Sequence, residues 1–319
     1  MLPVIVIIGP TASGKTRLAV QLARRLGGEV LSADSRQVYR GMDIGTGKDL
    51  SDYESGSGRV PYHLIDVVEA GEKYHVYRFQ EDAKGVLEDL QQKGTPAIVC
   101  GGTGLYLDAL LRQHQFTGIP VDEALRAELN ELTEEDLLAL FHQTPSAYSP
   151  RADTSTRKRL IRAVEISTYL RQHPEFSFPA QPKETPFLVF GLNPPVPVRR
   201  ERISTRLQFR LRHGLIEEVE GLLQKGLSPE QLIYYGLEYK YLTEYLVGQH
   251  TYEQMTRRLE TEIHRFAKRQ MTFFRKIERD GIQIQWLDWE SDFETQVDEI
   301  HNRWKGAPNQ LIGTNPEKS

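Results

Sequence analysis

The first hundred residues alternate between short apolar runs and amphipathic stretches. Four apolar runs have the length and composition of buried strands, namely residues 4–9, 29–34, 62–68 and 95–102. Residues 17–26 and 75–94 carry apolar side chains at helical spacing and end at glycines. This β-α-β-α order predicts a parallel sheet covered by helices, with ligands bound at the carboxyl ends of the strands.

The pattern changes near residue 120, where helical periodicity continues without strands to residue 172. The proline-rich residues 173–186 read as a linker, and FLVFGL (187–192) as a strand that returns to the sheet. Helical spacing then runs to about residue 280, IQIQWLD (282–288) is a possible last strand, and residues 305–319 lack periodicity. The chain is therefore divided into four predicted parts: a core at 1–119, a helical insertion at 120–172, core completion with helices at 173–290, and a helix with a loose tail at 291–319.

Composition narrows the class of protein. The chain has 319 residues, of which 39% are apolar and 26% charged, enough for a large core and a second domain or insertion. Its one cysteine, Cys100, excludes an internal disulfide and a thiolate metal cluster. The apolar run at residues 1–8 is too short to span a membrane. We expect a cytoplasmic enzyme without a membrane segment, acting as a monomer.

The net charge of −4 hides three basic segments. Residues 151–162 hold five basic residues against one acid, residues 199–212 six against one, and residues 257–276 seven against two. Each alone is compatible with a solvated helix face. Together, in an acidic chain, they indicate patches that bind a polyanion such as a folded RNA.

The string GPTASGKT, Gly9 to Thr16, lies between the first predicted strand and helix. Its spacing fits the phosphate loop G-x-x-x-x-G-K-[ST], whose backbone N–H groups surround phosphate oxygens at a helix N-terminus. Lys15 would neutralise phosphate charge, and Thr16 would hold Mg²⁺. The loop predicts an α/β protein with a P-loop NTPase-like parallel sheet core, flanked by helices and carrying a helical insertion domain.

The second strand ends in an acid, Asp34, beside this loop. Such a carboxylate can orient Mg²⁺ or accept a proton from a nucleophile, although a helix cap or turn residue is the alternative. Ser35, Gln37 and Tyr39 follow closely and suit hydrogen bonding to a planar polar substrate such as a base edge.

Two further features point to the same edge of the sheet. CGGTGLY (100–106) is a second strand-to-helix junction in which Thr103 offers a hydroxyl, although a tight turn also explains its glycines. Arg206 lies one turn from Arg202 and is a candidate second cation for a diphosphate, with a surface salt bridge as the alternative. Cys100 is expected to be a buried strand residue.

Seven strings, in order, resemble the tRNA dimethylallyltransferases, also called tRNA isopentenyl transferases, over residues 3 to about 287. They are GPTASGKT, SADSRQVYRGMDIGTGK, HLIDV, CGGTGLYLDALL, RLIRAVEI, RISTR…GLIEEV and FAKRQMTFFR. The resemblance implies transfer of the dimethylallyl group of dimethylallyl diphosphate to N6 of adenosine 37 in tRNAs that read codons beginning with U. Mg²⁺ is the implied cofactor, and tRNA and dimethylallyl diphosphate are the implied partners.

The resemblance also implies roles for individual residues. Asp34 matches the general base, and Lys15 and Arg206 match catalytic cations at the diphosphate. The implied diphosphate contacts are Gly9, Thr11, Ala12, Ser13, Gly14, Lys15 and Thr16, with Thr16 as the metal ligand. The implied tRNA contacts are Asp34, Ser35, Arg36, Gln37, Thr103, Lys158, Arg159, Leu160, Ile161, Arg162, Lys268, Arg269 and Gln270.

Three departures from the family pattern are expected to face RNA. The family's GTAKP is GTGKD here (residues 45–49, departing within Gly47 to Asp49), its TRQYAKRQ is IHRFAKRQ (263–270), and its GYKE region is YYGLEYKY (234–241). The alternatives are a prenyltransferase acting on free adenine nucleotides, a P-loop small-molecule kinase and a non-catalytic RNA-binding module. The insertion and basic segments favour RNA over a free nucleotide.

Overall fold

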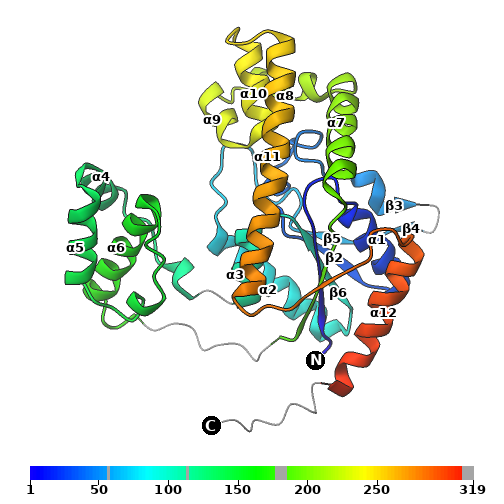
Figure 1. Ribbon diagram of the computed structural model, residues 1–319, viewed down its shortest axis with the longest axis horizontal. Helices are drawn as coiled ribbons and strands as arrows, with labels where there is room; N and C mark the ends of the chain where they lie inside the picture. Colours follow the sequence, from blue (N-terminus) through cyan, green and yellow to red (C-terminus); the bar gives the residue numbers. More distant parts are fainter. Residues whose placement is uncertain (56–57, 113–114, 177–184, 311–319) are drawn as a thin grey trace. The chain divides into compact units, whose positions relative to one another are not determined.

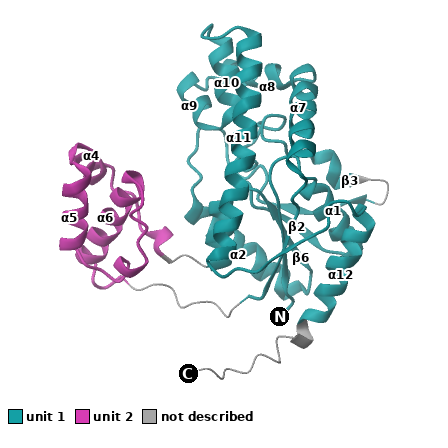
Figure 2. Ribbon diagram, viewed as in Figure 1, with its two compact units in different colours: residues 1–112, 185–319 teal, residues 113–184 magenta. Residues whose placement is uncertain are grey.

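The structure is a computed structural model that describes residues 1–55, 58–112, 115–176 and 185–310. It divides into two compact units (Figure 2). Unit 1 combines Met1–Arg112 with Thr185–Ser319, and unit 2 is Gln113–Glu184. The predicted insertion at 120–172 falls within unit 2.

A six-stranded sheet forms the centre of unit 1, in the order β5-β2-β6-β1-β7-β8 (Figure 1). Each neighbouring pair is parallel. The strands are β1 (Val4–Ile8), β2 (Glu29–Ser32), β5 (Tyr62–His63), β6 (Ala97–Gly101), β7 (Phe187–Gly191) and β8 (Ile284–Trp286). The parallel sheet predicted from the strand-helix alternation is thus confirmed.

Strand β1 is buried on both faces, which explains its unbroken apolar sequence. Side chains alternate between the faces of a strand. Val4, Val6 and Ile8 accordingly join one hydrophobic core, and Ile5 and Ile7 join the other.

Helices close both cores. On the Ile5 face lie α1 (Lys15–Leu26) and α12 (Phe293–Gln310), which bury Leu18 and Ile300. On the Val6 face lie α2 (Val76–Lys93), α3 (Gly104–Arg112) and α11 (Tyr252–Arg279). This arrangement leaves the carboxyl ends of β1, β2 and β6 as the edge where the glycine-rich strings emerge.

The half of α11 near its N-terminus packs with a group of shorter helices (Figure 1). They are α7 (Val196–Arg212), α8 (Leu215–Gln224), α9 (Pro229–Tyr234) and α10 (Leu237–Leu246). One stripe of α11 is buried along its whole length, from Met255 through Ile263 to Phe274. The opposite, basic side of α11 is therefore left for solvent or a ligand.

Unit 2 is helical, as predicted for its central part. It contains η2 (Gln115–Gly118), α4 (Glu123–Glu131), α5 (Glu134–Gln143), η3 (Ser149–Arg151) and α6 (Arg157–Gln172). Leu129, Leu137 and Leu160 belong to its own small core. The Thr133 hydroxyl accepts the Asp136 N–H at 3.1 Å and starts α5, so a new helix begins here within the stretch of predicted helical periodicity.

Two local predictions are wrong. The strand expected at 62–68 is only Tyr62–His63, because Leu64 and Asp66 have φ of 59° and 56°, outside the extended region. Residues 305–310 belong to α12 rather than to a loose tail. Before β5 in the sequence lie η1 (Leu50–Tyr53) and the short antiparallel pair β3 (Glu54–Ser55) and β4 (Gly58–Arg59). The predictions for 177–184 and 311–319 lie outside the described residues.

Among the described helices, none combines the length and the apolar character needed to cross a membrane.

Candidate active site

The phosphate loop joins β1 to α1 through two residues with positive φ, Ala12 (62°) and Gly14 (94°). The Ser13 hydroxyl is buried, and it has no hydrogen-bond partner in the described part of the chain. A Cβ on Gly9 would lie 2.6 Å from that oxygen and 2.9 Å from the Leu192 carbonyl, so only glycine fits. A curved loop with an unpartnered hydroxyl at a helix N-terminus suits an anion.

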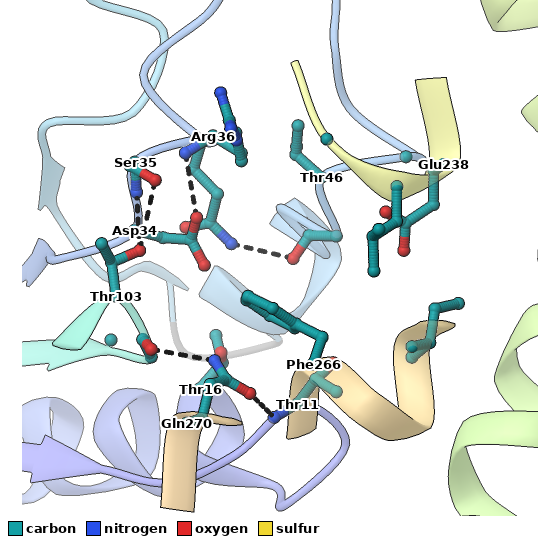
Figure 3. A pocket seen from close by; sticks show the side chains of 18 of the residues that line it. Thr11, Thr16, Asp34, Ser35, Arg36, Thr46, Thr103, Glu238, Phe266 and Gln270 are labelled. Carbon is teal, nitrogen blue, oxygen red and sulfur yellow. Dashed lines mark hydrogen bonds between the residues drawn. The ribbon is translucent and has the colours of Figure 1, made fainter. Parts of the chain in front are cut away.

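Gln270, predicted as an RNA contact, is buried and holds this loop in place. Its Oε1 accepts the Thr11 N–H at 2.8 Å, and its Nε2 donates to the Gly102 carbonyl at 2.8 Å (Figure 3). A Cβ on Gly102 would lie 2.4 Å from Nε2, which explains the glycine there. The side chain thus connects α11 to the loops after β1 and β6.

A cavity of about 430 Å³ opens at the carboxyl ends of β1, β2 and β6. Lys15 and Thr16 from the phosphate loop line it together with Asp34 and Thr103. The phosphate loop and the acid at the end of the second strand, predicted as neighbours, therefore share one cavity. Cys100 also lines it, and burial raises the pKa of its thiol to about 11, so the thiol is a poor nucleophile at neutral pH.

Five cations of unit 1 line this cavity: Lys15, Arg36, Arg206, Arg210 and Arg269. Arg206, on α7, donates a hydrogen bond to the Thr11 hydroxyl, so the predicted second cation does reach the loop. Burial lowers the pKa of Lys15, and burial followed by repulsion from Arg210 lowers the pKa of Arg206 to about 10. Lowered cation pKa values indicate groups that lack enough counter-charge and would gain from a bound anion.

Asp34 is positioned by its own turn. Its Oδ1 accepts the Arg36 N–H at 3.0 Å, and the next residue, Ser35, donates its N–H to Thr103 Oγ1 at 3.0 Å (Figure 3). Within the described residues, Oδ2 of Asp34 accepts no hydrogen bond. One carboxylate oxygen is thus committed to the backbone, and the other can take up a proton.

Gln37 and Arg36, predicted to hold a base, have different surroundings. The Gln37 amide is buried, where its Oε1 accepts from Ser32 Oγ at 2.7 Å and its Nε2 donates to the Gly47 carbonyl at 3.0 Å. Arg36 lies over the exposed ring of Tyr234, 5.5 Å from its centroid. Gln37 therefore holds the loop at residue 47 in place, and Arg36 keeps its donors near the surface.

The predicted RNA contacts fall on two helices. Lys268 and Arg269 are exposed on α11. In unit 2, Lys158 and Arg159 are exposed on α6, but Leu160 and Ile161 are buried in the core of that unit. These two apolar side chains position the helix rather than face a ligand.

Arg162, also predicted as an RNA contact, is bound within unit 2. Its guanidinium donates to the carbonyls of Ile119 and Pro120, at 2.5 and 3.1 Å, and lies 3.3 Å from the Glu165 carboxylate. Its hydrogen bonds therefore hold the start of the unit to α6.

Sequence reasoning missed several cavity residues. Glu238 at the start of α10 lines the cavity, and burial raises the pKa of its carboxyl. Phe266 and Phe273 of α11 supply apolar surface. Gly47 and Asp49, expected to face RNA, line the same cavity. Two sequence features could have indicated these residues: the seven-residue spacing of Phe266 and Phe273 along α11, and the difference from the family's GTAKP at residues 47–49. Neither feature identifies a cavity by itself.

Comparison with known proteins identifies the family. A family model described as IPP transferase matches residues 37–277, and one described as isopentenyl transferase matches residues 2–66. The chain is 46% identical over 303 residues to tRNA dimethylallyltransferase 2 of Bacteroides fragilis, covering 94% of this chain and 97% of that protein. This chain belongs to the tRNA dimethylallyltransferase family.

Other relatives and solved structures agree. A tRNA dimethylallyltransferase 1 of Porphyromonas gingivalis is 48% identical over 287 residues, covering 89% of this chain and 93% of that protein. A crystal structure of a tRNA isopentenylpyrophosphate transferase from Bacillus halodurans has a TM-score of 0.70 at 32% identity, covering 98% of this chain and all of that one. A eukaryotic dimethylallyltransferase described as acting on tRNA shares the fold, with a TM-score of 0.75 at 24% identity, covering 100% of this chain and 81% of that one. The family and fold class predicted from the tRNA dimethylallyltransferase strings are confirmed.

Proposed function

We propose that this chain transfers the dimethylallyl group of dimethylallyl diphosphate to N6 of adenosine 37 in tRNAs that read codons beginning with U, with release of diphosphate. The observation that carries the proposal is one cavity that the phosphate loop, Arg206, Arg210 and the Asp34 carboxylate all line. The family to which the chain belongs supports the choice of donor and acceptor.

The phosphate loop would hold the leaving group. Breaking the bond between the allylic carbon and oxygen sends the electron pair to the diphosphate and leaves a cation-like carbon. Lys15, Arg206 and the N–H groups at the start of α1 would stabilise the growing negative charge, because fixed donors in a dry cavity act without reorganising. The unpartnered Ser13 hydroxyl would supply one more hydrogen bond.

Asp34 would act as the general base. The exocyclic amine of adenine is a weak nucleophile because its lone pair is delocalised into the ring. As N6 forms its bond to the allylic carbon, the nitrogen loses a proton, which Oδ2 of Asp34 would accept while Oδ1 stays bonded to the Arg36 N–H. The Ser35 and Thr103 pair, joined at 3.0 Å, would fix the wall against which the base lies.

The residues present fit a magnesium ion that is shared with the substrate. Mg²⁺ prefers oxygen ligands, keeps several waters and is commonly bound through substrate phosphates with one or two protein oxygens. Thr16, in the first turn of α1, lines the cavity beside Lys15 and would hold the ion. Such an ion would neutralise charge on the departing diphosphate.

The basic helices would hold the RNA. Lys268 and Arg269 lie on the exposed side of α11, whose buried side carries Gln270, and Lys158 and Arg159 lie on the surface of unit 2. An adenine within an anticodon loop must leave its stack to enter a cavity at a sheet edge, so base flipping is the expected route. The lone buried thiol, Cys100, supports action in a reducing cytoplasm.

The decisive experiment incubates the protein with labelled dimethylallyl diphosphate, Mg²⁺ and bulk tRNA from a strain lacking this modification. Nucleoside analysis should place the label on N6 of a single adenosine in tRNAs that read codons beginning with U. Label on free adenylate instead would indicate the nucleotide prenyltransferase. Transfer of the γ-phosphoryl group of labelled ATP, without prenyl transfer, would indicate a kinase.

A further inference from the structure

Arg210 is a buried arginine that lines the cavity one helical turn after Arg206 on α7. The residue is 7% exposed and lines the cavity. Within the described chain its side-chain hydrogen bonds all go from Nη2 to the Asp49 carboxylate, at 3.0 and 3.3 Å. Nε and Nη1 therefore remain available as donors to a ligand.

Gly47 makes the space that Arg210 occupies. A Cβ on Gly47 would lie 2.5 Å from Nη2 of Arg210 and 3.1 Å from Nη1. Gly47 also has a φ of 66°, in the left-handed region. A side chain at this position would displace the guanidinium from Asp49.

The backbone around Gly47 cannot easily shift, because a carboxylate binds the turn that precedes this residue. Glu218 of α8 accepts the N–H groups of Asp43, Ile44 and Gly45 at 2.8, 2.7 and 3.0 Å. The Gly47 carbonyl is held in turn by Gln37 at 3.0 Å. The guanidinium thus lies against backbone that is fixed on both sides.

Asp49 supplies the charge that a buried arginine needs. An uncompensated buried cation is strongly destabilising, whereas an ion pair with hydrogen bonds offsets part of the desolvation. The Arg210 side chain is 9% exposed and the Asp49 side chain 47%, so the pair spans the boundary between the cavity wall and solvent. Gly47 and Asp49 are also the positions where the chain departs from GTAKP, and the structure shows that both changes meet at Arg210.

Arg210 and Asp49 act electrostatically on the two cations at the phosphate loop, Lys15 of the loop itself and Arg206 of α7. Arg210 contributes to the lowered pKa of Arg206, whereas Asp49 acts in the opposite direction on the pKa of both Arg206 and Lys15. Coulomb interactions fall with distance, and the pair is close enough to influence these two cations. A diphosphate bound between the same cations would therefore also be within the electrostatic reach of the pair.

We propose that Arg210 is a second arginine of the diphosphate site, and that Gly47 and Asp49 hold it there. The inference rests on the proposed function, since it assigns one more contact to the diphosphate of that reaction. Asp49 has two effects: it stabilises the buried guanidinium before the anion arrives, and it repels the free diphosphate after transfer. Asp49 therefore favours product release.

The test is a calorimetric titration of inorganic diphosphate, with Mg²⁺ present, into the whole protein and its variants. Arg210→Gln should weaken binding about tenfold, the effect expected of removing one charge-assisted hydrogen bond. Asp49→Asn keeps an oxygen acceptor for Arg210 Nη2 but removes the negative charge, so it should tighten binding several-fold and slow product release in steady-state turnover. Arg212→Gln removes an exposed arginine from the end of the same helix and should leave the affinity unchanged.

Gly47→Ala provides a coupled test. It should weaken diphosphate binding in the parent protein but have no further effect when Arg210→Gln is already present, as in a double-mutant cycle. An equal weakening in both backgrounds would show that the alanine acts through the loop and would overturn the assignment to Arg210. Should Arg210→Gln not fold, Arg210→Lys keeps the charge, and its diphosphate affinity must still fall because the planar fork is absent.

Failure of this inference is separable from failure of the proposed function. Parent-like diphosphate affinity in folded Arg210→Gln, with prenyl transfer to tRNA intact, overturns only the role of Arg210. Absence of prenyl transfer by the parent protein overturns the proposed function, whatever the titrations give.

Discussion

Arg206 donates a hydrogen bond to the hydroxyl of Thr11, so a helix that starts after the insertion completes the phosphate loop at the N-terminus, 195 residues away in sequence. This hydrogen bond places a positive charge at one end of the cavity. A diphosphate held by the loop would therefore meet the Arg206 guanidinium.

Replacing Arg206 with alanine should raise the KM for dimethylallyl diphosphate about 10- to 100-fold, because the variant cannot donate a charge-assisted hydrogen bond to the diphosphate. Arg202→Ala is the matched control, since Arg202 is exposed one turn earlier on α7. Steady-state kinetics at saturating tRNA measure the effect. Equal KM values for the two variants would contradict a diphosphate-binding role for Arg206.

Asp34→Asn should lower the rate of prenyl transfer about 10²- to 10⁴-fold, the usual contribution of a general base. Asparagine keeps the Oδ1 acceptor for the Arg36 N–H, so the turn is preserved while the proton acceptor is removed. Single-turnover kinetics report the rate, and filter binding of tRNA should match the parent protein. A fast Asp34→Asn variant would show that another group takes the proton.

The lowered pKa of Lys15 predicts a pH effect on diphosphate binding. Burial makes this ammonium group lose its proton at a lower pH than an exposed lysine, so diphosphate affinity should fall as pH rises through that lowered pKa. Lys15→Arg keeps its charge over the same range. Its titrations should therefore show a smaller decline, and identical pH profiles would exclude Lys15 as the titrating group.

The buried Lys15 should also lower the free energy of unfolding of the protein. The unfolded chain binds the Lys15 proton more tightly than the folded chain, so stability rises with pH as Lys15 deprotonates, and the charged form is unfavourable below that range. Lys15→Met should accordingly unfold at higher denaturant concentration than the parent at neutral pH. The difference should shrink in alkaline buffer, and a constant difference would point to packing instead.

The exposed cations of unit 2 give a prediction about RNA. Lys158→Ala combined with Arg159→Ala should weaken tRNA binding and reduce the salt slope of log affinity by about one for each phosphate that is no longer neutralised. The KM for dimethylallyl diphosphate should not change. Lys93→Ala removes an exposed lysine at the end of α2 and serves as the control. An unaltered salt slope in the double variant would remove α6 from the RNA interface.

Local patterns predicted the parts of the site that local sequence determines. The phosphate loop and Asp34 follow predicted strands directly, so their shared cavity could be inferred from parallel-sheet topology. The pairing of Arg210 with Asp49 spans 161 residues, and the Gln270 brace to Thr11 spans 259. The hydrophobic periodicity of a single segment cannot predict such a pairing, because the pairing depends on how α7 and α11 pack over the sheet.

The errors have equally physical causes. Residues 62–68 look like a strand in composition, but the backbone turns at Leu64 and Asp66, and an apolar run alone does not reveal a left-handed residue. The sequence string also groups Gln270 with Lys268 and Arg269, but a helix turns about 100° per residue, so the buried amide and the exposed cations lie on different faces of α11.

Helix α12 closes the core that contains Ile5 and Ile7, and its Trp304 donates its indole N–H to the Pro3 carbonyl at 2.9 Å. Strand β1 is synthesised long before α12, so one of its faces stays uncovered until that helix has been made. During synthesis that apolar surface stays open to chaperones and to other nascent chains. Truncations that remove α12 should therefore appear as aggregation during expression, before any catalytic defect could be measured.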